Sequence, residues 1–340
     1  MRADPTRSIL TALFLFAPGC ILNTAFPYNP RFTDSNGDGK SYFDGDCDEW
    51  PGHAGRPVIA GQGIYENLQE AVDAAKDGDV ITVCPLPGTQ EYGGLTVIEG
   101  KSISIVGGDD PDRIVLNGKD AGSTIRVADG SLTLENLTIT GGTGTRYTAD
   151  GSQEVLGGGI DAAFATGLTI ENCIIEANSA QFGGGVFAPV IEGAETLILD
   201  SMITDNEGSS SGGGLYLTLG GQIIGSSIYR NRSANAGGLT VTSGTVTITA
   251  SEIIANTASS NQGGGGALVL SARLNSEASE WGQGDTNNTP NDLMLTNSGG
   301  TRKSYNDKTS DETFSCDGSV PSCSWKQRGE GFSPSPLLSR

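Results

Sequence analysis

Four asparagines recur at a nearly constant spacing through the middle of the chain. Asn178, Asn206, Asn231 and Asn256 are 28, 25 and 25 residues apart. Isoleucine stands three positions before each of them, at Ile175, Ile203, Ile228 and Ile253. It also stands eight positions before each, at Ile170, Ile198, Ile223 and Ile248. A repeat of this length is typical of solenoids, in which each repeat buries its apolar face only against its neighbours.

The repeat predicts an all-β fold, a single-stranded right-handed parallel β-helix. We expect each repeat to form one coil of three short strands and three turns, stacked ~4.8 Å from the next coil. Equivalent isoleucines would then form internal columns. Asparagine tolerates the left-handed conformation of turns and can also extend amide hydrogen bonds along a column. Cys173 lies in a column with Ser201, Ser226 and Ser251 and is interpreted as a small stacked residue.

A glycine run followed by an apolar residue opens the strand after each asparagine loop. These runs are Gly157–Ile160, Gly183–Val186, Gly212–Leu215, Gly237–Leu239 and Gly263–Leu268. Together with the Ile-x-x-Asn endings, they resemble the repeats of polymorphic outer membrane proteins and of the wider pectin-lyase-like group of secreted β-helix proteins. The resemblance covers roughly residues 64 to 300 and implies the fold more strongly than any activity, because this fold hosts many functions.

The segment from Ile64 to Gly142 resembles the N-terminal entry of that group. Apolar residues at i, i+3, i+4 and i+7 predict a short helix that ends near Gly78 and caps the solenoid: Leu68, Ala71, Val72 and Ala75. The β-helix is expected over residues 61–325. Residues 20–60 are expected to form a linker rich in Asp, Gly and Pro, and residues 326–340 a disordered tail.

The first residues are typical of an export signal. Arg2 and Arg7 precede an apolar run, Ile9–Phe16, that is too short to span a bilayer. Residues 1–19 are therefore predicted to be a cleaved signal peptide. Cys20 at the cleavage junction resembles the lipidated cysteine of bacterial lipoproteins, although Ala17 stands where that motif usually has Leu. An ordinary secretory signal is the alternative.

Charge and cysteine content narrow the function classes. The net charge is −20 and no basic patch is evident, which argues against nucleic-acid binding. His53 is the single histidine, so a histidine metal site or a Ser-His-Asp triad has little support. Among the six cysteines, we expect Cys316 to pair with Cys323 and Cys47 with Cys84.

The outer face of the strand after each glycine run is where enzymes of the resembling group carry their sites. Alternation places five side chains outward on it: Asp161, Phe187, Tyr216, Thr240 and Val269, the last with Leu268 inward. A lyase needs a base and a cation here, and an inverting glycosidase needs two facing carboxylates. These positions and the next outward set contain no Lys, Arg or His, and Asp161 is their only acid.

Phe187 and Tyr216 are expected to stack on adjacent coils. Such a pair either forms a platform for a sugar ring or an apolar partner, or only covers the sheet and stabilises neighbouring coils.

An acidic segment near the N-terminus resembles the calcium loops of secreted proteins. Asp34, Asn36 and Asp38, followed by Asp44 and Asp46, supply alternating oxygen ligands around glycines, as Ca²⁺ requires. Gly45 stands where an EF-hand has Glu, so an acidic solvated linker is an equal alternative. A second polar cluster, Asp285–Asp292, is expected to form the turn that closes the last coil, with a calcium site as the alternative.

These features favour a non-enzymatic, surface-exposed lipoprotein, anchored to a bacterial envelope by lipid alone and monomeric. Adhesion, structural display or contact with a polysaccharide or surface protein would be its role. The alternative is a carbohydrate-active enzyme, a lyase or a glycosidase, on the same fold.

Overall fold

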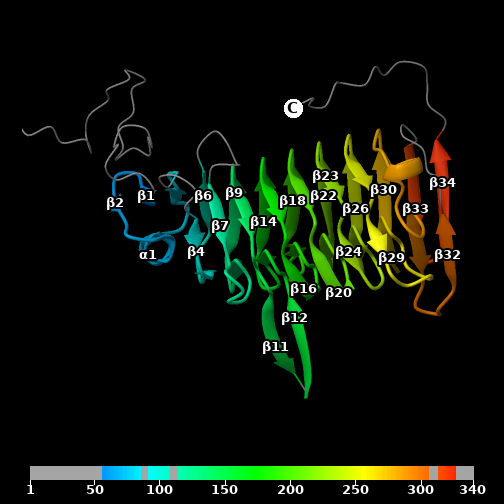
Figure 1. The fold of residues 1–340 in the computed structure, drawn as a ribbon, viewed down its shortest axis with the longest axis horizontal. Coiled ribbons are helices and arrows are strands. Elements are labelled where there is room, and N and C mark those ends of the chain that lie inside the picture. Colours follow the sequence, from blue (N-terminus) through cyan, green and yellow to red (C-terminus); the bar gives the residue numbers. More distant parts are fainter. Residues whose placement is uncertain (1–55, 86–90, 108–113, 150, 306–312, 327–340) are drawn as a thin grey trace, which may run out of the picture.

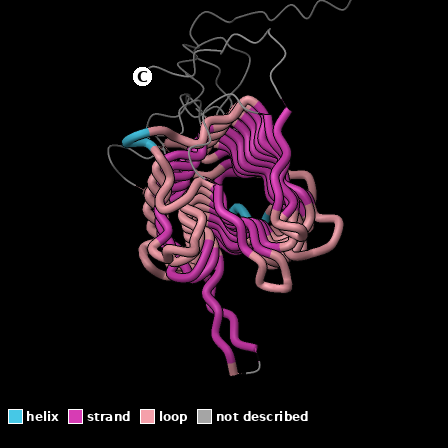
Figure 2. Tube along the Cα trace, turned by 90° about the vertical axis from the view of Figure 1, so that its right-hand side faces the viewer, coloured by secondary structure: helices cyan, strands magenta, loops and turns pink. Residues whose placement is uncertain are grey.

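A computed structural model describes residues 56–85, 91–107, 114–149, 151–305 and 313–326. The chain forms a parallel β-solenoid of about seven turns, which confirms the predicted fold class (Figures 1 and 2). The end-on view in Figure 2 shows the coils superimposed around one axis.

Four sheets run along the solenoid. Sheet A contains β1 (Val58–Ile59), β2 (Gly63–Ile64), β3 (Val80–Thr82), β6 (Ile103–Val106), β9 (Ser131–Glu135), β14 (Gly167–Glu171), β18 (Glu195–Leu199), β22 (Gly220–Ile224), β26 (Thr245–Thr249), β30 (Arg273–Glu277), β33 (Thr313–Asp317) and β34 (Ser322–Lys326). Sheet B contains β4 (Tyr92–Gly93), β7 (Val115–Asn117), β10 (Thr138–Thr140), β15 (Ile174–Glu176), β19 (Met202–Thr204), β23 (Ser227–Tyr229) and β27 (Glu252–Ile254).

The other two sheets contain nine and six strands. Sheet C contains β5 (Thr96–Ile98), β8 (Ile125–Val127), β13 (Ile160–Asp161), β17 (Val186–Phe187), β21 (Leu215–Leu217), β25 (Leu239–Val241), β29 (Ala267–Leu270), β31 (Leu293–Thr296) and β32 (Arg302–Tyr305). Sheet D contains β11 (Thr145–Ala149), β12 (Ser152–Leu156), β16 (Ser179–Phe182), β20 (Glu207–Ser211), β24 (Arg232–Ser233) and β28 (Thr257–Ala258). A central coil thus has four strands, one from each sheet, and the expectation of three was wrong.

Both isoleucine columns are confirmed as internal ladders. Ile175, Ile203, Ile228 and Ile253 are fully buried and pair in register along sheet B. Ile170, Ile198, Ile223 and Ile248 do the same along sheet A. Stacking identical branched side chains removes both columns from water and forms a continuous core.

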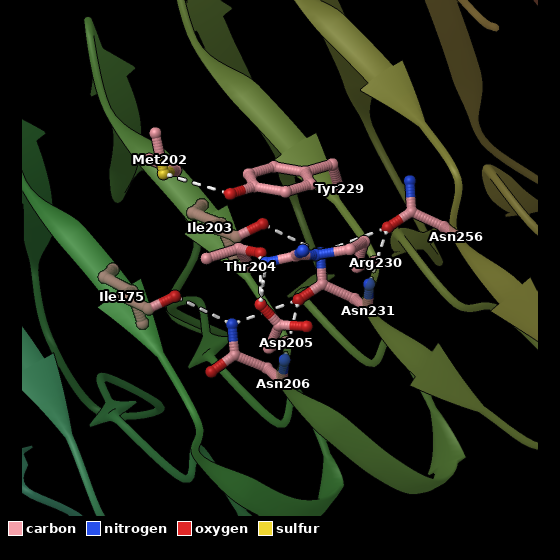
Figure 3. Close-up of polar contacts among 10 residues, drawn as sticks. All are labelled: Ile175, Met202, Ile203, Thr204, Asp205, Asn206, Tyr229, Arg230, Asn231 and Asn256. Atoms are coloured by element: carbon pink, nitrogen blue, oxygen red, sulfur yellow. Dashed lines mark hydrogen bonds and ion pairs between the residues drawn. The ribbon is translucent and has the colours of Figure 1, made fainter. Parts of the chain in front are cut away.

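The asparagines form a hydrogen-bonded ladder inside the coil (Figure 3). The Asn206 backbone N–H and side-chain amide each donate to Oδ1 of Asn231 at 3.0 Å, and the Asn231 groups donate to Asn256 at 3.0 and 3.1 Å. Each amide also donates to an isoleucine carbonyl of the preceding coil, such as Asn231 to Ile203 at 2.8 Å. The ladder continues to Asn288, which the spacing did not reveal because that coil is longer.

The left-handed residues of this turn are not the asparagines. Positive φ angles occur one position earlier, at Ala177, Asp205, Arg230 and Ala255, with values of 52°, 54°, 54° and 53°. The asparagines therefore act through their buried amides, and their tolerance of left-handed backbone is not used.

The serine column is a second polar ladder. Ser201 Oγ accepts from the Cys173 N–H at 3.0 Å and donates to the Leu199 carbonyl at 2.6 Å. The same pair of bonds recurs at Ser226 and Ser251. The Cys173 Sγ repeats the second bond, to Glu171 O at 3.2 Å, which agrees with its interpretation as a small stacked residue.

Close approach of neighbouring coils explains the glycine runs. Gly183 and Gly212 both have φ of 65°, a conformation that favours glycine. At Gly213, an added Cβ would lie 2.4 Å from the carbonyl oxygens of Arg232 and Gly237. A side chain at this position would push the coils apart.

The two ends are capped differently. The predicted helix is present as α1 (Leu68–Ala74), and Asn67 caps it by accepting from the Glu70 N–H. Leu68, Ala71 and Val72 pack into the core. At the other end, β32, β33 and β34 pair antiparallel, so the parallel β-helix does not extend to residue 325 as expected. At the N-terminal end, β1 of sheet A already lies inside residues 20–60, the segment expected to be a linker.

Candidate functional site

A two-stranded arm projects from the side of the solenoid. Strands β11 and β12 pair antiparallel over five residue pairs, and β12 joins sheet D only through Leu156 and Phe182 (Figure 1). Sequence analysis missed this arm. The signal that could have revealed it is Asp150-Gly151, a typical tight-turn dipeptide between β-forming residues.

Tyr147 fixes the arm against the outer face of sheet C. Its hydroxyl donates to Asp161 Oδ2 at 2.7 Å. Its ring meets Phe164 edge-on with centroids 5.6 Å apart, and the Arg126 guanidinium lies 5.7 Å from the ring centroid. These three contacts connect the arm to two successive coils.

Asp161, the outward acid expected from the sequence, is fully buried beneath this arm. Its other oxygen, Oδ1, accepts from the Ala163 N–H at 3.2 Å. Burial raises the pKa of Asp161, and the bonds from Tyr147 and Ala163 oppose the rise only in part. Burial and the hydrogen bond to Asp161 raise the pKa of Tyr147 to about 12, so Tyr147 remains a hydrogen-bond donor.

The outer face also holds a cation that sequence analysis missed. Arg126 on β8 pairs in register with Asp161 on β13. Its coil enters sheet C through Ser123 and Thr124, without a glycine run, so the repeat pattern did not reveal it. The Arg126 Nε is buried and has no hydrogen-bond partner in the part of the chain that the structure describes.

The coil that contains β29 reverses the expected orientation of two residues. Ala267 and Val269 pair with Leu239 and Val241 and are buried, whereas Leu268 pairs with Thr240 on the outer face. The glycine run of this coil, Gly263–Gly266, is longer than the others, and that shifted the assignment by one residue.

Phe187 and Tyr216 stack as expected. Their rings are nearly parallel, 8° apart, with centroids separated by 5.0 Å. Phe182 of sheet D meets Tyr216 edge-on at 5.3 Å. Phe187 is only 6% exposed and packs in a small cluster with Leu156 and Ala163, so it cannot offer its face to a sugar. The contacts favour the alternative in which the pair covers and stabilises the sheet.

These groups do not assemble an accessible acid–base pair. The residues in register with Asp161 along the outer face are Arg126 and Phe187, and neither is a second carboxylate. An inverting glycosidase needs two carboxyl groups ~6.5–9.5 Å apart, and a lyase base must reach its substrate. Asp161 is instead occupied by Tyr147 and Ala163.

A shallow groove lies at the base of the arm on the sheet D side. Its lining combines hydroxyl, amide and carboxylate groups with two small apolar side chains: Thr143, Val155, Ser179, Ala180, Gln181, Glu207 and Ser209. The Val155 N–H donates to Gln181 Oε1 at 3.3 Å and joins the arm to this lining.

Several residues singled out in the sequence lie outside the described part of the chain. They are Cys20, Cys47, Asp34, Asn36, Asp38, Asp44 and Asp46, so the calcium and lipid expectations stay predictions. Cys316 and Cys323 form the expected disulfide, and Cys84 is disulfide-bonded. Within the described ranges, no three His, Cys, Asp or Glu side chains cluster as metal ligands.

The polar cluster at Asp285–Asp292 closes the last coil. It contains the short 3-10 helix η4 (Gly284–Thr286) and Asn288, the final rung of the asparagine ladder. The Asn288 amide donates to Asp292 Oδ1 at 3.0 Å. Asp292 is fully buried, so its carboxyl group belongs to the core of the last coil.

Comparisons with known proteins give little further information. No protein-family model matches the chain, and no curated protein matches it. A crystal structure of Escherichia coli YbhC is similar with a TM-score of 0.25 and 13% identity, over 69% of each chain. That TM-score is too low to support an inference about function. None of the described helices is long and apolar enough to cross a membrane.

Proposed function

We propose that this chain is a non-enzymatic, exported β-solenoid that displays its outer surface for adhesion or for contact with a polysaccharide or surface protein. One observation carries the proposal. Asp161, the acid best placed for chemistry on the outer face, is fully buried and held by Tyr147 and Ala163. A carboxyl group in this position stabilises the arm and is closed to substrate.

The arm and the groove at its base are the proposed contact surface. The arm stands out from an otherwise regular solenoid (Figure 1), and projecting elements on rigid scaffolds commonly carry binding residues. Gln181 and Ser209 offer amide and hydroxyl groups beside it. Such groups exchange hydrogen bonds with sugar hydroxyls without requiring charge on the glycan.

Lipid attachment at Cys20 would hold the solenoid at the bacterial surface. The evidence for it is the signal-like segment before Cys20. Cys20→Ser should release the protein from the membrane fraction into the soluble fraction. Intact-mass analysis of the mature wild-type protein that shows an unmodified Cys20 thiol would contradict this anchoring.

The test of function is a panel of neutral and acidic polysaccharides incubated with the purified protein. We expect binding of at least one polymer without release of reducing ends or unsaturated product. Gln181→Ala with Ser209→Ala should weaken that binding, whereas Gln222→Ala, an exposed amide on sheet A, should leave it unchanged. Product release that Asp161→Asn abolishes would instead establish the lyase or glycosidase alternative.

A further inference from the structure

The outer face of sheet B carries apolar side chains that the core does not use. Strands β15, β19, β23 and β27 each bury one isoleucine, so their flanking residues point outward. Four of these outward residues are apolar and at least partly exposed: Ile174, Met202, Tyr229 and Ile254. Met202 is 37% exposed.

These four residues form two pairs in the two rows that flank the buried isoleucine column, and Ser227 and Thr204 complete those rows between them. Ile174 pairs in register with Met202, and Tyr229 pairs with Ile254. The Tyr229 hydroxyl lies 3.6 Å from the Met202 sulfur, which joins the two pairs (Figure 3). On neighbouring sheet A, Leu197, Leu199 and Ile224 also point outward and are partly exposed, and Leu199 pairs with Ile224. We call these seven residues the apolar strip.

Carboxylates surround the apolar strip. They come from sheets A and B and the loops beside them: Glu171, Glu176, Asp200, Glu252, Glu277 and Glu280. The strands that carry the strip contain no Lys or Arg. Arg230, which follows β23, lies over the Tyr229 ring, 4.8 Å from its centroid, and is paired with Asp205 at 2.6 Å (Figure 3). Apart from this paired guanidinium, the surface is apolar in the centre and negative at its rim.

We propose that the apolar strip is a docking surface for a basic, amphipathic segment of a partner protein. Its aliphatic and aromatic side chains would bury the apolar side of that segment, and the rim would attract flanking Lys or Arg residues. A second copy of this chain carries the same rim and a net charge of −20, so it is repelled. Anionic lipid surfaces are repelled for the same reason.

The test uses a short, capped, fluorescent helix of Leu and Lys as the probe, with a Leu and Glu helix of the same pattern as the charge control. Wild-type protein should bind the Leu/Lys helix, less tightly as salt is raised, and should not bind the Leu/Glu helix. Met202→Ser with Tyr229→Ser removes the centre of the strip and keeps every carboxylate. It should weaken binding by about tenfold or more.

Two further comparisons separate docking from unspecific attraction to an acidic protein. Glu176→Gln with Glu252→Gln should also weaken binding. The matched variant Val190→Ser with Glu192→Gln, an exposed apolar residue and an exposed acid beside sheet C, should change it less than about twofold. Circular dichroism checks that every variant keeps its β-structure.

Three outcomes would overturn the proposal. The first is unchanged binding of the Leu/Lys helix to Met202→Ser/Tyr229→Ser, because the attraction would then be unspecific. The second is a wild-type dimer in sedimentation that this variant dissociates, because the occupant would be a second copy. The third is wild-type binding to phosphatidylglycerol vesicles that the same variant loses.

Discussion

Removing one rung of the asparagine ladder should destabilise the solenoid far more than removing any exposed asparagine. Asn231 is fully buried, and its Oδ1 accepts from both the N–H and the side-chain amide of Asn206 at 3.0 Å. Its own amide donates to the Ile203 carbonyl at 2.8 Å and to Asn256 Oδ1 at 3.1 Å. Asn231→Ala removes all four bonds.

The size of the effect follows from the groups left without a partner. The Asn206 N–H loses its acceptor and the Ile203 carbonyl loses the side-chain donor, whereas the Asn206 amide keeps Ile175 O and Asn256 Oδ1 keeps the Asn231 N–H. Each buried orphan costs about 1–3 kcal/mol. The Ile203 carbonyl stays in the parallel ladder between β19 and β23, so the Asn206 N–H is the one full orphan. One orphan predicts that Asn231→Ala lowers the free energy of unfolding by about 1–3 kcal/mol.

Denaturant unfolding followed by circular dichroism measures the total loss, and hydrogen exchange by mass spectrometry locates it. Exchange should rise most in the coils that contain Asn206, Asn231 and Asn256. Asn235→Ala is the matched control, because Asn235 is exposed and its amide makes one bond, to Ser210 O at 2.9 Å. A loss at Asn231 no larger than at Asn235 would refute the ladder as a source of stability.

Ile228→Asp should abolish cooperative unfolding around its coil, because Ile228 is fully buried between Ile203 and Ile253. Ile228→Val should lower the free energy of unfolding by only about 0.5–1.5 kcal/mol. Equal melting curves for the two variants would contradict this prediction. Cys173→Ser should change stability by less than about 1 kcal/mol, because serine makes the same bonds at Ser201 and Ser226. Burial raises the pKa of the Cys173 thiol to about 12, so the native protein should resist iodoacetamide, and rapid alkylation would show that the thiol is accessible. Burial raises the pKa of Asp161, so the folded state holds the Asp161 proton at pH values where the unfolded state has released it. The wild type should therefore lose stability as the pH rises above the ordinary carboxyl range, and Asp161→Asn should lose less. Thermal melting of both proteins across pH measures this, and identical pH profiles would exclude it.

The isoleucine and asparagine columns could be predicted because each position repeats one residue type at one spacing. The left-handed positions could not, because Ala177, Asp205, Arg230 and Ala255 share no side-chain chemistry. What they share is a left-handed backbone conformation one position before the buried asparagine. A column defined by backbone angle alone leaves no pattern in the sequence.

The candidate site was harder to predict than the fold because it depends on residues that do not follow the repeat. Asp161, Phe187 and Tyr216 were found because they follow glycine runs, but their burial depends on an arm that interrupts the repeat. Arg126 belongs to an early coil without the glycine run. Departures from the repeat shape the candidate site, and a search for the repeat passes over them.

The direction of the asparagine ladder has a consequence for how the chain reaches its native state. Each asparagine side chain donates one bond back to an isoleucine carbonyl of the preceding coil, but the bonds that join one rung to the next all run toward the C-terminus, from Asn178 to Asn206 and onward to Asn288 and Asp292. A ribosome makes the donors first, so the newest coil always waits for an acceptor that has not yet been synthesised. Any fragment that stops before the last coil ends on an unsatisfied rung, whatever its length. The ladder closes only once Asn288 and Asp292 are in place, so nascent intermediates that stop before these residues should be sensitive to proteases at their growing end.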